Sequence, residues 1–241
     1  MIWRFIMKKS KTLQYALLAT LVSTPFVLVP ATNAIAAETS QATISFTAPN
    51  DPVKPVDPSD PSKPLDQGKH NGKATGESGP LTLDYVSNLD FGSHTISTAE
   101  ETYQATTLSP FVQVSDRRGT GAGWNVTAQL SNFQQNGENS LPGASINLTG
   151  AEVDSTSKTP KPVPNSNITL NSGSDSSVNI VKANAKTGAL NTAQGLGTWI
   201  TKWLSKGQTN EKATLTIPEA AAMPGNHAAT VTWTLSDGPG A

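Results

Sequence analysis

Two stretches of the chain alternate strictly between apolar and polar side chains. Residues 124–131 (WNVTAQLS) place four apolar side chains on one face: Trp124, Val126, Ala128 and Leu130. Residues 229–236 (ATVTWTLS) repeat the pattern with Val231, Trp233 and Leu235. Successive side chains of a strand point to opposite faces of its sheet, so this alternation predicts two half-buried strands.

Shorter apolar and β-branched runs extend the same pattern along the chain. They lie at residues 43–47, 81–86, 111–115, 144–148, 178–181 and 213–217. Clusters of Gly, Pro, Asn and Ser, such as QQNGENSLPG and TPKPVPNSN, separate them and favour turns. Many short strands with turn-rich connections predict an all-β fold, namely an antiparallel β-sandwich or barrel-like domain with long loops and a proline-rich surface segment.

One segment is ambiguous between strand and helix. In residues 197–207 (GTWITKWLSKG), Trp199 and Trp203 share a face at either the strand or the helical period. The flanking glycines, Gly197 and Gly207, and the shortness of the segment favour a strand.

Residues 49–66, called the proline segment below, carry a proline at every third position from Pro49 to Pro64. A polyproline II helix repeats every three residues without internal hydrogen bonds, so the spacing predicts a stiff extended element. It lies between two strand-like stretches. It is therefore either a strap along the surface of one domain or a free stalk that precedes the domain.

The first 37 residues have the pattern of a secretory leader. Lys8, Lys9 and Lys11 precede an apolar run from residue 15 to 29, and small residues follow near Ala36. We expect residues 1–37 to be a signal peptide and residues 38–241 to form one domain, with no transmembrane segment after the leader is removed.

Net charge and cysteine content limit the classes of partner and of chemistry that we expect for this chain. The formal net charge is −1, and removal of the four positive charges in residues 1–37 brings it to −5. This balance argues against an electrostatic grip on nucleic acid. The chain has no cysteine, so neither disulfides nor thiolate chemistry can operate after export.

Motifs for catalysis and metal binding are missing from the sequence. There is no Gly-x-Ser-x-Gly elbow and no His-Glu-x-x-His, and His94 and His227 lack a second ligand at metal spacing. We therefore expect no enzyme, no cofactor and no metal site.

Four stretches together resemble a known family: LDYVSNLDFGSHTIS, VSDRRGTGAGWNVTAQLSNF, LPGASINLTG and ATLTIPEAAAMPGNHAATVTWTLSDGP. In order and content they are similar to the WxL domain of Gram-positive surface proteins. The most specific parts are the stretch from Asp116 through Arg118 to Trp124 and the terminal Trp233-Thr234-Leu235. Two positions depart from the family pattern: Val126 stands in place of leucine in the first motif, and His227 in place of a tyrosine.

The resemblance implies non-covalent binding to the cell wall, specifically to peptidoglycan, by a protein secreted to the cell surface. It also implies the company of other WxL proteins and of a membrane-anchored surface partner. The protein is then a surface protein or a subunit of a surface complex. An adhesin that grips a host extracellular-matrix protein, through an exposed strand edge or through the Trp199 and Trp203 surface, is the alternative.

The tryptophans have two interpretations. Trp124 and Trp233, with Val126 and Leu235, either stack on sugar rings or fill the core, and their place on the apolar face of each strand favours the core. Trp199 and Trp203, which are flanked by lysines, are the better candidates for an exposed platform. Arg118 either clamps a carboxylate of the ligand or pairs with a local acid such as Asp116.

Overall fold

The computed structural model describes residues 38–239, which divide into two units. Residues 38–45 belong to the first unit and contain no helix or strand. The second unit begins at Phe46 and holds all of the strands described below. The predicted signal peptide lies outside the described residues.

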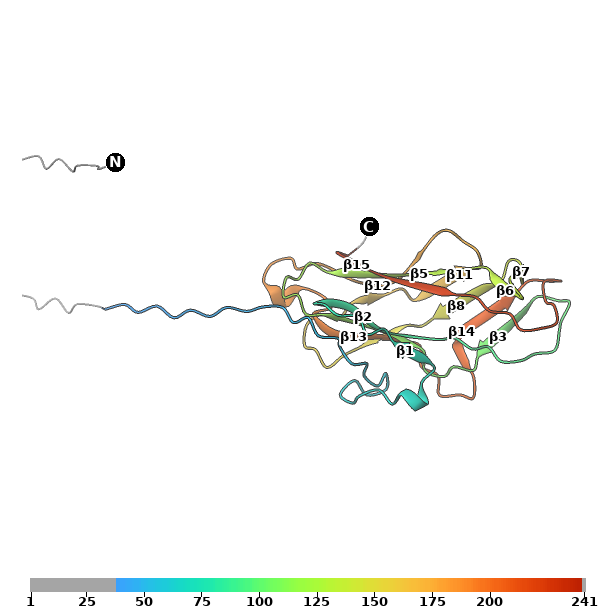
Figure 1. Ribbon diagram of the computed structural model, residues 1–241, viewed down its shortest axis with the longest axis horizontal. Helices are drawn as coiled ribbons and strands as arrows, with labels where there is room; N and C mark the ends of the chain where they lie inside the picture. The colour runs from blue at the N-terminus through green and yellow to red at the C-terminus, as the bar shows by residue number, and fades with distance from the viewer. Residues whose placement is uncertain (1–37, 240–241) are drawn as a thin grey trace, which may run out of the picture. The chain divides into compact units, whose positions relative to one another are not determined.

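Three antiparallel sheets build the second unit (Figure 1). A five-stranded sheet has the order β1 (Gly72–Ala74), β2 (Leu81–Ser87), β4 (Phe111–Asp116), β13 (Gly197–Lys202), β9 (Glu152–Asp154). A four-stranded sheet has the order β10 (Val163–Pro164), β12 (Val178–Ala183), β5 (Trp124–Leu130), β15 (Val231–Asp237). The other four-stranded sheet has the order β11 (Asn167–Asn171), β8 (Ser145–Thr149), β14 (Asn210–Ile217), β3 (Glu101–Ala105).

Three small elements complete the described chain. Strands β6 (Phe133–Gln135) and β7 (Glu138–Ser140) form a hairpin around the tight turn at Asn136 and Gly137. Short 3-10 helices lie at Gln67–Lys69 and Leu190–Thr192.

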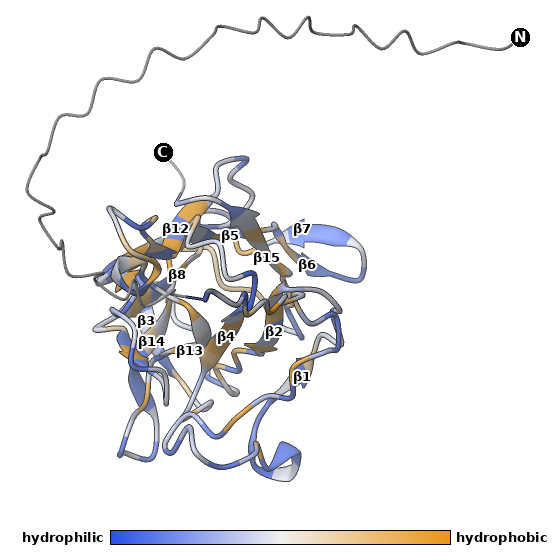
Figure 2. Cartoon of the chain, turned by 90° about the vertical axis from the view of Figure 1, so that its left-hand side faces the viewer, coloured by the Kyte–Doolittle hydropathy of each residue, from blue (hydrophilic) through white to orange (hydrophobic). Residues whose placement is uncertain are grey.

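The sheets pack as a sandwich around one main core, and no sheet closes into a barrel. Buried side chains from all three sheets meet there, for example Val114 of β4, Val126 of β5 and Leu148 of β8. Figure 2 shows hydrophobic stretches on strands of different sheets, such as β12 and β4. The predicted all-β sandwich is therefore confirmed.

Most of the predicted strands are confirmed. The two alternating stretches are β5 and β15, and the ambiguous segment is strand β13 up to Lys202. The burial of β5 alternates at every position, as the pattern predicts. Five shorter runs correspond to β2, β4, β8, β12 and β14.

The predicted strand at residues 43–47 is wrong. No strand is assigned there, and no other described residue pairs with this stretch. Ile44 is 80% exposed and Phe46 is 86% exposed. Apolar and polar side chains alternate here as in a strand, but no strand of the described chain lies next to them to form backbone hydrogen bonds.

The proline segment lies on the outer face of the five-stranded sheet, so it is a strap and not a free stalk. It is not one straight polyproline rod, because Val56 pairs with Pro64 and the backbone N–H of Asp57 donates to the carbonyl of Lys63 at 2.9 Å. Val56 and Leu65 pack on a second small core of Tyr85, Phe111 and Ile200.

Gln113 joins the proline segment to the sheet. Its side-chain oxygen accepts the backbone N–H of Val56 at 2.8 Å, and its amide nitrogen donates to Asp84 at 2.8 Å. All six residues of β4 are buried: Val112 and Val114 face the main core, and Phe111 and Gln113 contact the proline segment.

A bulge in β2 places Asp84 beneath the proline segment. The register with β4 shifts between Leu83 and Tyr85, so Asp84 and Tyr85 both reach the outer face. Asp84 is buried and accepts hydrogen bonds from Thr82, Gln113 and Ser115. Burial raises the pKa of its carboxyl group, although these donors oppose the shift.

This buried carboxyl group predicts how stability responds to pH. Its folded-state pKa lies above the ordinary value of 3.8, so the folded state takes up a proton before the unfolded chain does. Between neutral pH and about pH 4, acidification should raise the unfolding free energy of the parent relative to that of Asp84→Asn. Urea denaturation of both proteins across this range checks the sign, and a difference that stays flat or falls would contradict it.

Candidate functional site

The two Trp-x-apolar motifs lie on neighbouring strands. Strand β15 pairs with β5 so that Leu235 lies opposite Val126 and Asp237 lies opposite Trp124. The four apolar motif side chains therefore point to the same face of the sheet, toward the main core. Trp124 and Val126 are fully buried, whereas Trp233 and Leu235 are half-buried against the core.

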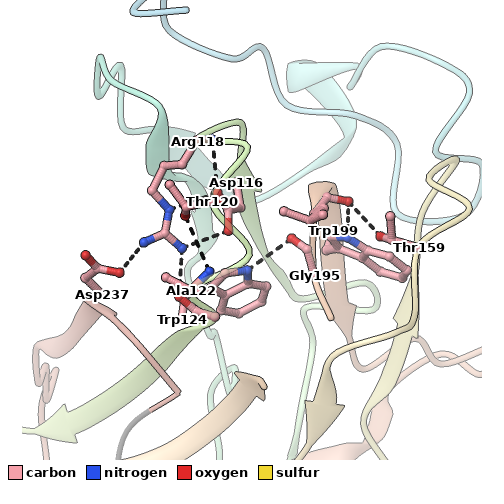
Figure 3. A network of polar contacts seen from close by, with 11 residues as sticks. Asp116, Arg118, Thr120, Ala122, Trp124, Thr159, Gly195, Trp199 and Asp237 are labelled. Atoms are coloured by element: carbon pink, nitrogen blue, oxygen red, sulfur yellow. Dashed lines mark hydrogen bonds and ion pairs between the residues drawn. The ribbon is translucent and has the colours of Figure 1, made fainter. Parts of the chain in front are cut away.

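Two consecutive carbonyl groups hold two of the buried indoles (Figure 3). The indole N–H of Trp124 donates to the carbonyl of Gly195 at 3.1 Å, and that of Trp199 donates to the carbonyl of Leu196 at 2.9 Å. Gly195 has φ +72°, and a Cβ there would lie 2.6 Å from the Trp124 indole nitrogen. Only glycine fits this close approach, so Trp124 is built into the core.

The exposed platform predicted at Trp199 and Trp203 is wrong. Trp199 is 2% exposed and Trp203 is 1% exposed, and both belong to the main core. Trp199 lies on β13, which is internal to the five-stranded sheet, and Trp203 directly follows that strand. The neighbouring Lys202 is also buried, because its ammonium group contacts Asp154 at 2.7 Å and the carbonyl of Pro58 in the proline segment at 2.8 Å.

Arg118 connects the ends of three strands (Figure 3). Its guanidinium donates two hydrogen bonds to Asp116 at the end of β4, at 2.9 and 2.8 Å, and one to the carbonyl of Gly123 at 2.7 Å. It also contacts Asp237 at the end of β15. The hydrogen bonds with Asp116 raise the pKa of Arg118. The interpretation of Arg118 as the partner of a local acid is thus the one that the geometry supports.

Arg117 contacts a different part of the chain from Arg118. Its guanidinium donates to the carbonyl groups of Asp51 and Gly79. Arg117 thus anchors the beginning of the proline segment. The side chains of both arginines are engaged within the domain.

A groove of about 890 Å³ opens beside the exposed side of Trp233, and we call it the Trp233 groove. Its apolar lining includes Tyr103, Phe133, Leu215, Val231 and Trp233. Uncharged polar side chains also line it, among them Asn88, Ser93, Thr95, Asn226 and Thr230. The groove lies between β15 and the loop that follows β2.

Two histidines line the Trp233 groove. The ring of His94 stacks on Tyr103 with centroids 4.1 Å apart. His227, which stands where the family pattern has a tyrosine, is hydrogen-bonded to Ser140 at 2.9 Å and to the carbonyl of Met223 at 3.0 Å. Among the described residues of the lining, Asp90 is the one Asp, Glu, Lys or Arg, so the groove suits a ligand that is recognised by contact and hydrogen bonding.

The sequence model of the WxL domain surface cell wall-binding family matches residues 33–239. This chain belongs to that family. Comparisons with curated proteins and with solved structures gave no significant match.

Within residues 38–239, the WxL domain has no helix that is long and apolar enough to cross a membrane. That same part of the chain contains no cluster of three or more His, Cys, Asp or Glu side chains placed to hold a metal ion.

Sequence reasoning missed the groove and the role of Gln113 in the WxL domain. The groove residues come from β2, β3, β6, β8, β14, β15 and three loops, so no local pattern unites them. For Gln113, a polar residue in the middle of an apolar run was an available signal, because a buried polar group needs hydrogen-bond partners.

Removal of Arg118 should cost the WxL domain much of its stability. The Asp116 side chain is fully buried, so Arg118→Ala leaves a buried carboxylate without its cation, at a cost of about 3 to 5 kcal/mol. The matched control is Lys212→Ala, which removes the partner of the exposed Glu152 and should cost less than about 1 kcal/mol. Chemical denaturation measures both values, and equal stability of the two variants would refute this role of Arg118.

Proposed function

We propose that this WxL domain binds peptidoglycan non-covalently, in the Trp233 groove. The observation that carries the proposal is the half-buried Trp233 at the border of a groove with aromatic walls and almost no charge. Trp233 belongs to a motif of a cell wall-binding family and faces a space that a ligand can enter.

The chemistry of the lining fits a glycan strand. A sugar ring presents C–H groups on its faces, which pack against aromatic rings, and hydroxyl and amide groups around its edge, which need hydrogen-bond partners. Trp233, Tyr103 and His94 supply rings. Asn226 and Thr95 supply exposed polar groups at the same groove.

Electrostatic attraction is not the source of binding in this proposal. The chain after residue 37 has a formal net charge of −5, and the wall of the proposed host is rich in anionic polymer. Arg117, Arg118 and Lys202 are engaged with groups of the domain itself. Shape and hydrogen bonding then provide the affinity.

The proposed setting is the surface of a Gram-positive cell, reached by export and cleavage of the leader. The protein acts there as a binding module and not as an enzyme, because its family is a surface binding family. Other WxL proteins and a membrane-anchored protein are proposed neighbours in a surface complex. The adhesin alternative cannot use Trp199 and Trp203, which are buried.

Replacement of Trp233 tests the site. Trp233→Ala should weaken co-sedimentation with purified peptidoglycan about tenfold while the protein remains folded, because one face of the ring lines the groove. Trp124→Ala should instead destabilise the domain by about 3 to 5 kcal/mol. Leu190→Ala, at a side chain that is 41% exposed and lies outside the groove lining, is the control for general surface effects.

Thermal melting monitored by circular dichroism separates loss of the ligand contact from loss of the fold. A folded Trp233→Ala protein that sediments with peptidoglycan as well as the parent would contradict the proposed site.

A further inference from the structure

Residues 42–47 (ATISFT), called the arm below, have the pattern of a strand but no strand to pair with. Ile44 and Phe46 share one face of the arm, and Thr43, Ser45 and Thr47 share the other. Ile44 and Phe46 are the two most exposed large hydrophobic side chains among residues 38–239. Two such side chains on one face of an extended segment are typical of a strand that is completed by another chain.

The edge of β15 is a matching acceptor. The backbone N–H of Ser131 donates to Thr230, and that of Gly238 donates to Gly123, which sets the phase of the ladder with β5. The alternation of an antiparallel ladder then directs the backbone groups of Thr232 and Thr234 to β5. Those of Val231, Trp233 and Leu235 point to the open edge, where no described residue bonds to them.

This edge has little of the usual protection against pairing. Strand β15 has seven residues, no proline and no register shift with β5, and its one charged residue, Asp237, is at the end of the strand. Edge strands normally avoid association by being short, or by carrying charges, prolines or bulges. Among the other outer strands, β1, β9 and β10 have only two or three residues, β10 contains Pro164, and β3 begins with Glu101. Strand β11 has five uncharged residues, but none of them lines the groove.

The Trp233 groove runs along this open edge. Val231 and Trp233 line one side of it, and the loop from Ser87 to Ile96 lines another. Met223 and Ile96 at the groove are 41% and 48% exposed, so large apolar surface stays uncovered there. The groove therefore lies where a further strand of this sheet would pair with β15.

We propose that the arm of one copy of this chain pairs with the open edge of β15 in a second copy. Six extended residues span about 20 Å, which matches the length of a seven-residue strand. The arm is uncharged, as the groove lining nearly is. Ile44 and Phe46 then enter the groove beside Trp233, and Thr43 and Thr47 face solvent.

The arm and the acceptor edge are different surfaces of each copy. Two copies that exchange arms close as a dimer, whereas an arm passed on to a third copy gives a ring or an open chain. The contact of Arg117 with Asp51 fixes the point from which each arm leaves the proline segment. The arm occupies the groove proposed for peptidoglycan, so the two ligands exclude one another.

Sedimentation velocity of the exported chain, from micromolar to millimolar concentration and without peptidoglycan, tests the proposal. The parent should associate as concentration rises, and Ile44→Asp with Phe46→Asp should associate at least about 100-fold more weakly. Thr43→Asp with Thr47→Asp puts the same two charges on the other face of the arm and should associate like the parent. A parent that stays monomeric, or an Ile44→Asp, Phe46→Asp protein that associates equally well, would overturn the proposal.

Amide hydrogen exchange locates the contact independently. Exchange of the Trp233 and Leu235 amides should slow with concentration in the parent and not in the Ile44→Asp, Phe46→Asp variant. The Thr232 and Thr234 amides should stay slow in both, because they bond to β5. Association without slower exchange at Trp233 and Leu235 would also overturn the proposal. The variant should still co-sediment with peptidoglycan, so a failure of the arm contact is distinct from a failure of wall binding.

Discussion

One guanidinium group joins the ends of three strands, two of which carry the Trp-x-apolar motifs. Arg118 joins the end of β4, the residue before β5 and the end of β15 through Asp116, Gly123 and Asp237. Gly123 leaves no room for a side chain, since a Cβ there would lie 2.4 Å from the carbonyl of Ala183. These contacts hold the ends of β5 and β15 together, and the seven-residue pairing of the two strands places one motif tryptophan in the core and the other at the groove.

The two halves of the family signature therefore have different physical roles. Trp124 is fully buried, and its N–H is satisfied by a carbonyl group that only a glycine can bring so close. Trp233 is half-buried and faces a groove. The first motif thus has a structural role in the core, whereas the second borders the groove that we propose as the binding site. Packing in the core therefore explains Trp124, and the proposed wall contact concerns Trp233.

The alternation of apolar and polar residues predicts a strand correctly where one face of the strand is buried and the other is not. The alternation in residues 124–131 was sufficient for β5, because one of its faces is buried and the other is not. The exposed platform predicted at Trp199 and Trp203 rested on their lysine neighbours, which are typical of a solvated strand. The proline segment covers Lys202, and that contact joins residues far apart in the sequence. Residues 43–47 show the converse case, in which strand alternation exists without a partner strand in the described chain.

We propose that the Trp233 groove, and not the buried tryptophans, contacts the wall. Nuclear magnetic resonance titration with soluble peptidoglycan fragments tests it most directly, because each indole N–H and each backbone amide reports separately. The account predicts that the largest shift changes occur at Trp233, Tyr103 and Asn226, while the indole signals of Trp124 and Trp199 stay nearly constant. Changes concentrated on another face of the domain, with the Trp233 signals unmoved, would contradict it.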